Sequence, residues 1–455
     1  MNDINETIGR QREYFGSGAT RPVEFRRKML KALRTALERH EEELYAALYE
    51  DLHKGREEAF LTELSIVYQE ISAHLRGVAR WSRRRSVRPA LQVLPSRSYV
   101  AAEPLGTALI IAPWNYPVNL LFTPLVGAIS AGCTAVLKSS PYTPHVDEVM
   151  ERIVTETFDE RYIAYFRGGR EVNTALLAGR YDIIFFTGSP SLGRVVMEAA
   201  AKHLTPAVLE LGGKSPCIVD RTADVEMAAK RTVWGKTLNA GQTCIAPDYL
   251  FIHKDVKERF MKAARKYIKE FYGENPMASP IYPRIVSEKA MKRLVRLLKS
   301  DGETVIGGEY DMGERYIAPT FIDGISPDSD IMQEEIFGPV MPVMEFETIE
   351  SVIEYINSHE KPLALYYFGD RGTARRVTGR TSSGGVCVND TIMHIANPHL
   401  PFGGVGNSGM GAYHHRRTFE AFTHRKAVLV SNKRVELPVK YPPYKWVKCI
   451  KGLLK

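Results

Sequence analysis

A series of short apolar runs, separated by helical stretches, begins at Gly106 and constrains the fold more than any other feature. The runs are residues 107–112, 135–138, 164–166 and 182–186, each followed by a turn. Apolar strands joined by helical crossovers form a parallel sheet that helices cover on both faces. Ligands of such sheets bind beyond the carboxyl ends of the strands, so functional residues are expected directly after these runs.

A second unit with the same alternation runs from Glu210 to about residue 395, with strand-like runs at 218–219, 249–252 and 385–389. Residues 1–82 show apolar side chains at helical spacing, which we interpret as a packing face without chemistry of its own. Residues 83–103 have the alternation of an extended hairpin. A chain of 455 residues is too long for one core, so two or three α/β domains are predicted.

The composition narrows the class of protein. Hydrophobic residues make up 44% and charged residues 25%, as in soluble globular proteins, and no apolar run is long enough for a transmembrane helix. The five cysteines are scattered and form no disulfide framework, which favours a reducing cytoplasm. The net charge of +8 is partly concentrated at 80–88 and 433–455. Without a nucleic-acid-binding module, we interpret the first stretch as solvated surface and predict no nucleic-acid partner.

The stretch Asn-Ala-Gly-Gln-Thr-Cys-Ile-Ala-Pro at 239–247 contains the best candidate for a nucleophile, Cys244. The cysteine follows a helical-looking run and precedes a proline, so it lies where an element ends and backbone amides are near its sulfur. Amides and cations favour the thiolate, which is the nucleophilic form of cysteine. The alternative is a small buried apolar residue, which is the role of most free cysteines.

Two further polar residues have positions that suit catalysis. Glu210 lies in the apolar run 208–211, which Gly212 and Gly213 terminate. Apolar flanks could raise the pKa of its carboxyl toward neutrality, as a general base working near pH 7 requires. Asn115 follows the first strand, where its amide can donate to a developing oxyanion, or can simply serve as a turn residue before Tyr-Pro.

With these three residues in one order, the chain resembles the aldehyde dehydrogenases, and most closely the class 3 group of fatty and aromatic aldehyde dehydrogenases. Phe-Thr-Gly-Ser at 186–189, Glu-Glu-Ile-Phe-Gly-Pro at 334–339 and Pro-Phe-Gly-Gly at 401–404 extend the resemblance, which covers about residue 10 to about residue 430. It implies two doubly wound parallel-sheet domains plus a small β oligomerisation element. It also implies NAD(P)-dependent oxidation of aldehydes to carboxylic acids through a cysteine thiohemiacetal and thioester.

The resemblance assigns roles to single residues. Cys244 attacks the carbonyl carbon, the Asn115 amide and the Cys244 backbone N–H stabilise the oxyanion, and Glu210 activates the hydrolytic water. Glu335 binds the nicotinamide ribose and Phe337 touches the nicotinamide. The other implied cofactor-binding residues are Trp114, Lys138, Thr187, Gly188, Ser189, Gly193, Leu211 and Gly212.

Residue 141 departs from the family pattern. The family commonly has a glutamate three residues after Lys138, where it binds the adenine ribose, and here Pro141 takes that place. Losing this carboxylate removes a repulsive charge against a 2′-phosphate. We therefore expect the chain to accept NADP as well as NAD. Viewed without the resemblance, Lys138 could equally face water.

Domain limits and partners follow from the same pattern. We predict a dinucleotide-binding domain at 1–82 and 104–209, a catalytic domain at 210–395, and an oligomerisation hairpin and C-terminal tail at 83–103 and 396–455. A homodimer is implied. The tail at 441–455 mixes aromatic, aliphatic and lysine side chains, so it suits either a membrane interface or the partner subunit. The chain would then be cytoplasmic, either free or membrane-associated.

The substrate and the rival functions are the least constrained. Trp114, Tyr116 and Trp234 indicate an apolar tunnel, which suits medium- or long-chain aliphatic or aromatic aldehydes. The histidines have no metal-ligand spacing, so no metal is predicted, and His414-His415 is interpreted as a solvated pair. Two alternatives are a non-catalytic dinucleotide-binding protein of the same fold and a thiol esterase.

Overall fold

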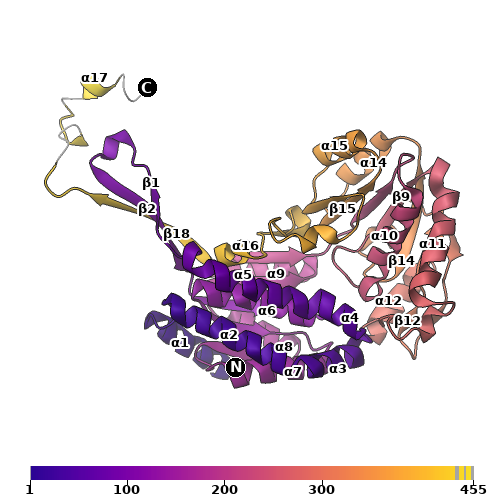
Figure 1. Cartoon of the computed structure of the whole chain (residues 1–455), viewed down its shortest axis with the longest axis horizontal. Coiled ribbons are helices and arrows are strands. Elements are labelled where there is room, and N and C mark those ends of the chain that lie inside the picture. Colours follow the sequence, from indigo (N-terminus) through magenta and orange to yellow (C-terminus); the bar gives the residue numbers. More distant parts are fainter. Residues whose placement is uncertain (1, 436–439, 445–446, 452–455) are drawn as a thin grey trace.

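Two large β-sheets with their helices form the body of the molecule, and a narrow arm projects from it (Figure 1). The structure is a computed structural model that describes residues 2–435, 440–444 and 447–451. Within these residues the strands also form a three-stranded sheet in the arm and a two-stranded ribbon of β11 (Tyr310–Asp311) and β12 (Tyr316–Ile317). The predicted α/β class is confirmed.

The strands of each large sheet run parallel except at one edge. In spatial order the first sheet contains β17 (Gly409–Met410), β7 (Ala207–Leu211), β6 (Ile183–Gly188), β3 (Thr107–Ile111), β4 (Thr134–Lys138) and β5 (Ile163–Phe166). The second contains β10 (Glu303–Ile306), β13 (Thr320–Asp323), β14 (Val340–Phe346), β9 (Tyr249–His253), β8 (Pro216–Val219), β15 (Ala364–Phe368) and β16 (Gly385–Val388). The antiparallel edge strands are β17 and β10.

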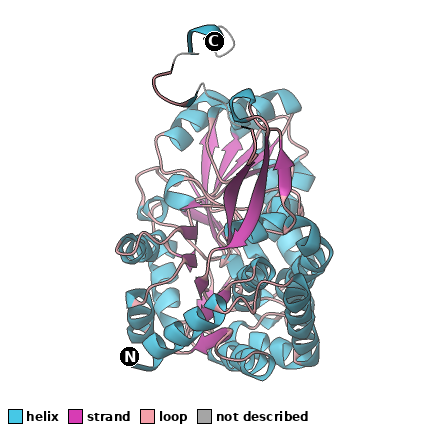
Figure 2. Ribbon diagram, turned by 90° about the vertical axis from the view of Figure 1, so that its left-hand side faces the viewer, coloured by secondary structure: helices cyan, strands magenta, loops and turns pink. Residues whose placement is uncertain are grey.

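Helices lie on both sides of the strands (Figure 2). Those of the N-terminal half are α1 (Asn2–Gly16), α2 (Val23–Arg39), α3 (Glu41–Leu52), α4 (Arg56–Ala59), α5 (Ser65–Trp81), α6 (Pro117–Ala131), α7 (Pro144–Thr157), α8 (Arg170–Ala178) and α9 (Pro190–Ala201). Those of the C-terminal half are α10 (Val225–Thr237), α11 (Lys257–Tyr272), α12 (Glu288–Leu298), α13 (Asp330–Gln333), α14 (Ile349–Asn357), α15 (Arg371–Arg380), α16 (Arg416–Ala421) and α17 (Val447–Ile450).

Alternate residues of the central strands pack on opposite faces of the first sheet. Ala108 and Ile110 of β3 join the core that includes α2, α5 and α6, whereas Leu109 and Ile111 join the core formed with α1, α8 and α9. Full burial of one such aliphatic side chain stabilises a fold by about 1.5–3 kcal/mol. Burial on both faces explains why these strands read as continuous apolar runs in the sequence.

The arm is built from β1 (Arg85–Val87), β2 (Ser96–Pro104) and β18 (Thr423–Ser431). The last of these, β18, pairs antiparallel with β2 along its whole length, from Thr423 opposite Pro104 to Ser431 opposite Ser96. The arm therefore joins the hairpin predicted at 83–103 to a strand from late in the chain. At its base, Ala102 packs against the core of the body, whereas Leu429 and Val430 are exposed.

Two of the predicted domain limits can be compared with the elements of the structure. The limit between residues 209 and 210 falls inside β7, which pairs with β6, so Glu210 belongs to the first sheet. The predicted tail lies partly outside the described residues, at 445–446 and 452–455. The division into functional domains remains a prediction.

None of the described helices is long and apolar enough to span a membrane.

Packing between α6 and α16 gives a test of the fold. A Cβ added to Gly127 would lie 2.4 Å from Thr418 Cγ2 and 3.0 Å from the Thr418 carbonyl oxygen. We expect Gly127→Ala to lower the free energy of unfolding by about 1–3 kcal/mol, measured by urea denaturation. The control is Gly9→Ala in α1, where no atom lies within 4 Å of the new Cβ, and stability should rise by about 0.5–1 kcal/mol. Equal unfolding midpoints for the two variants would contradict this packing.

Candidate active site

Cys244 follows a left-handed turn at the end of α10. Asn239, Ala240 and Gly241 have φ values of 51°, 51° and 73°. Such angles are costly for residues with a side chain, and they occur where the surroundings impose them. At Gly241 a Cβ would lie 2.2 Å from the Gly338 carbonyl oxygen, so only glycine fits. The residues directly before Cys244 are buried, and Cys244 itself is partly exposed.

The surroundings of Cys244 disfavour its ionised form. Burial raises the pKa of the thiol to about 12, and the carboxyls of Glu335 and Glu210 act in the same direction. The backbone N–H groups of Cys244 and Ile245 lower the pKa, as the sequence predicted, but their effect is smaller than that of burial. A positive charge brought close to the sulfur would shift the pKa back toward neutrality.

Asn115 reaches the same turn from the loop after β3. Its side chain is 3% exposed, and Nδ2 donates to the Gln242 carbonyl oxygen at 3.0 Å. The next residue, Tyr116, shares a 2.6 Å hydrogen bond with Thr243 through the two hydroxyls. Two successive residues thus join the end of β3 to the two residues before Cys244. The role of Asn115 as an oxyanion donor remains a prediction.

Glu210 extends from β7 into a closed, apolar setting. Its side chain is 3% exposed, and neither carboxyl oxygen has a hydrogen-bond partner. Burial raises the pKa of Glu210 well above its ordinary value, in the predicted direction. A Cβ on Gly403 would lie 3.2 Å from Oε1 of Glu210, and Gly409 of β17 is the strand partner of Glu210. The glycine-rich loop at 401–409 therefore leaves just enough room for this carboxyl.

Four predicted cofactor residues meet in one place. A Cβ on Gly212 would lie 2.1 Å from Oε2 of Glu335, so this carboxyl rests against the Gly212 backbone. Burial raises the pKa of Glu335 to about 8. Phe337, with a φ of 50°, makes an edge contact to Trp114, with 5.5 Å between ring centres. A cavity of about 290 Å³ lies beside them, lined in part by Gly212 and Glu335.

Lys138 and Thr187 lie at the carboxyl ends of β4 and β6, the strands on either side of β3. Lys138 ends β4 and is 1% exposed, which excludes the alternative that it faces water. Burial lowers the pKa of its ammonium to about 8, against the opposing effect of Asp147. Thr187 lies in β6, and its buried hydroxyl has no partner. Their roles in cofactor binding remain predictions.

The remaining predicted cofactor residues surround the start of α9. Gly188 ends β6, and Ser189 caps the helix by accepting a hydrogen bond from the Leu192 backbone N–H at 3.4 Å. Gly193, one turn into the helix, packs against Leu211, whose Cδ2 would lie 2.8 Å from an added Cβ. This close contact holds the N-terminus of α9 beside β7. Free amides at such a helix start suit a pyrophosphate.

Sequence reasoning missed a buried charged cluster beneath the catalytic candidates. Lys54 and Glu63 form a 2.7 Å ion pair, and both side chains are fully buried. Glu58 accepts a hydrogen bond from the Asn239 backbone N–H at 2.9 Å. The interpretation of residues 1–82 as a packing face alone is therefore incomplete. In an amphipathic helical pattern, nothing distinguishes these charged residues from solvated ones.

The interpretation of His414-His415 as a solvated pair is wrong for His414. Its side chain is 6% exposed and stacks on Phe402, with 5.2 Å between ring centres. The backbone N–H of His415 donates to the Glu70 carboxylate at 2.8 Å, which draws this loop against α5. Across the described ranges, no group of three or more His, Cys, Asp or Glu side chains could hold a metal ion.

Comparison with known proteins agrees with this geometry. The sequence profile of the aldehyde dehydrogenase family matches residues 1–428. The chain belongs to the aldehyde dehydrogenase family. It is accordingly an oxidoreductase that oxidises aldehydes to carboxylic acids, and its two parallel sheets with a small antiparallel sheet are the aldehyde dehydrogenase fold.

Individual aldehyde dehydrogenases are similar over the full chain. A 4,4'-diaponeurosporen-aldehyde dehydrogenase of Staphylococcus aureus is 44% identical and covers 100% of both chains. A dimeric, NADP-preferring aldehyde dehydrogenase of Mus musculus is 42% identical over 97% of this chain and 98% of its own length. The solved structure of Staphylococcus aureus AldH in its substrate-bound state superposes with a TM-score of 0.98, at 44% identity and 100% coverage of both chains.

The raised thiol pKa predicts how Cys244 reacts before any dinucleotide is added. Because burial disfavours the thiolate, alkylation by iodoacetamide should be slow at pH 7 and accelerate up to about pH 10. Peptide mass spectrometry would locate the modified cysteine, with Cys244→Ala as the control. Rapid labelling of Cys244 at pH 7 that does not change with pH would show that this account of the thiol is wrong.

Proposed function

We propose that this aldehyde dehydrogenase oxidises apolar aldehydes, with NAD or NADP as the oxidant and Cys244 as the nucleophile. The observation that supports this most strongly is the convergence of three residues from separate elements. Asn115 from the loop after β3 is hydrogen-bonded two residues before Cys244, and the Glu210 carboxyl is close enough to raise the thiol pKa. A nucleophile, an oxyanion donor and a buried base are the groups that this oxidation requires.

Residues beside this centre fit a dinucleotide. The Thr187 hydroxyl is buried and unpartnered, and α9 begins two residues after the end of β6. Glu335 would hold the nicotinamide ribose against Gly212, and Phe337 would contact the nicotinamide. Lys138 would approach the adenosine ribose or its 2′-phosphate. When bound, the nicotinamide supplies the hydride acceptor, which no side chain provides.

Cys244, Asn115 and Glu210 have separate roles in the reaction. The Cys244 sulfur bonds to the aldehyde carbon, and the Asn115 Nδ2 and the Cys244 N–H donate to the resulting oxyanion. Losing one such donor typically costs about 3–4 kcal/mol of barrier stabilisation. After oxidation, Glu210 takes a proton from the water that hydrolyses the thioester. Because burial raises the pKa of Glu210, its ionised form is lost as pH falls, so hydrolysis should slow at lower pH.

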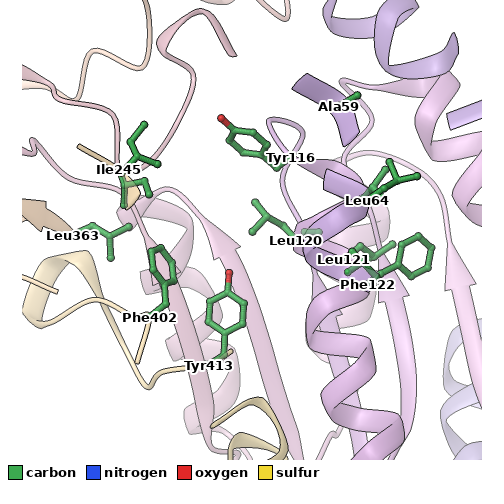
Figure 3. Close-up of a cluster of buried hydrophobic side chains, with 14 of the residues drawn as sticks. Ala59, Leu64, Tyr116, Leu120, Leu121, Phe122, Ile245, Leu363, Phe402 and Tyr413 are labelled. Atoms are coloured by element: carbon green, nitrogen blue, oxygen red, sulfur yellow. The ribbon is translucent and has the colours of Figure 1, made fainter. Parts of the chain in front are cut away.

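The substrate side of the cysteine is apolar. Figure 3 shows Phe402 and Tyr413 in one buried apolar cluster with Ile245, Leu363, Tyr116 and Leu120 of α6. The rings of Phe402 and Tyr413 meet edge-on, with 5.7 Å between their centres. This lining supports a medium- or long-chain aliphatic or an aromatic aldehyde. The Staphylococcus aureus relative is named for the aldehyde 4,4'-diaponeurosporen-aldehyde.

We propose further that the protein is a cytoplasmic homodimer. The arm supports this assignment because it exposes the apolar side chains of Val87, Leu429 and Val430. The mouse relative is named as dimeric. A peripheral membrane contact through the C-terminal tail remains a second proposal, based on the amphipathic sequence at 441–455. The proposed domains at 1–82 with 104–209 and at 210–395 follow the two sheets, apart from the positions of β7 and β17.

The proposed activity predicts a specific result in a spectrophotometric assay. Purified protein should reduce NAD and NADP, followed at 340 nm, when given aliphatic aldehydes of increasing chain length and aromatic aldehydes. Cys244→Ala should lose the reduction completely while still binding dinucleotide, and Cys217→Ala is the matched control with normal rates. Bound dinucleotide without reduction by any aldehyde would contradict the proposal. Strict dependence on NAD would contradict the NADP part alone.

A further inference from the structure

The buried ion pair of Lys54 and Glu63 is difficult to explain by stability alone. Lys54 follows α3, and Glu63 lies in a π-helical turn, Phe60–Leu64, between α4 and α5. Both side chains are fully buried, with 2.7 Å between Nζ and Oε1. Apolar replacement of such a pair is often neutral or stabilising, because desolvation of the two charges offsets their attraction. π-Helical turns are also frequent at functional sites.

The pair holds the segment that carries Asn115. Lys54 Nζ donates to the Asn115 carbonyl oxygen at 3.1 Å and lies 4.3 Å from the centre of the Tyr116 ring. The second oxygen of Glu63 accepts from the Asn119 backbone N–H at 3.0 Å, in the first turn of α6. One ion pair therefore fixes both ends of residues 115–119.

The opposite side of Asn115 is fixed by the turn before Cys244. Asn239 Nδ2 donates to the same Asn115 carbonyl oxygen at 2.9 Å. The Asn115 side chain in turn donates to the Gln242 carbonyl oxygen at 3.0 Å. The Asn115 peptide is thus clamped between a buried ammonium and the catalytic turn, which leaves its side-chain amide one orientation.

We propose that Lys54 is a positioning residue that holds the Asn115 amide at the oxyanion of the Cys244 adduct. This inference rests on the proposed function, because it assumes that Asn115 donates to that oxyanion. Lys54 does not touch the aldehyde. It acts through the Asn115 carbonyl oxygen, and Glu63 is its buried ion-pair partner at 2.7 Å.

The test variant must remove the ammonium without leaving a buried charge unpaired. Lys54→Met alone would leave Glu63 isolated and destabilise the fold. Lys54→Met/Glu63→Gln removes both charges, and glutamine keeps an acceptor for the Asn119 N–H. We expect kcat to fall about 10- to 100-fold, less than the 10²- to 10³-fold loss typical for deleting an oxyanion donor. The Kd for dinucleotide, measured by fluorescence, should stay unchanged.

The decisive arm introduces the same pair of substitutions into Asn115→Ala. Since Lys54 acts through Asn115, the extra loss in kcat should then be under about twofold, whereas an independent structural effect would multiply in full. The control is Lys257→Met, which removes a mostly buried lysine paired at 2.5 Å with Asp323 on β13, and should leave kcat unchanged. An unchanged kcat in Lys54→Met/Glu63→Gln, or full multiplication, overturns the inference alone. A normal kcat in Asn115→Ala overturns the proposed oxyanion role as well.

Discussion

The active site depends on a few buried hydrogen bonds between the loop after β3 and the turn after α10. The bonds from Asn115 to Gln242 and from Tyr116 to Thr243 connect a segment of the first sheet to a segment of the second unit. Neither segment contains the site by itself. Because backbone and side-chain partners are satisfied on both sides, a small movement between the two units would leave buried polar groups unpaired, at about 1–3 kcal/mol each. The hydrogen bonds between the two units therefore help to fix the position of Cys244.

Burial at this junction raises the pKa of both proposed catalytic residues, Glu210 and Cys244, but the rise favours the role of only one. It raises the pKa of the Glu210 carboxyl, which suits a base that must accept a proton near neutral pH. It also raises the pKa of the Cys244 thiol to about 12, which disfavours the nucleophile. A positive charge beside the sulfur, such as that of an oxidised nicotinamide, would lower this pKa. The glycines around the site, Gly241 and Gly403 among them, allow the close packing that produces this burial.

Much of this arrangement could be predicted from the sequence. The strands were predictable because burial on both faces makes them continuous apolar runs. Polar residues such as Asn115 could be found because they come directly after such a run in the sequence. The predicted limit at 209/210 falls inside β7 because the apolar run 208–211 gives no sign of which sheet it joins. Lys54 and Glu63 were missed because their burial arises only when α6 packs over them. His414 was misread because its burial comes from stacking on Phe402, a tertiary contact.

The central claim, that Cys244 carries the acyl group and Glu210 releases it, is tested most directly by single-turnover mass spectrometry of Glu210→Gln. With an aldehyde and dinucleotide, this variant should produce one equivalent of reduced cofactor and then stop. The intact mass should increase by the acyl group, and peptide mapping should place it on Cys244. Steady turnover at the wild-type rate without an acylated cysteine would contradict the account.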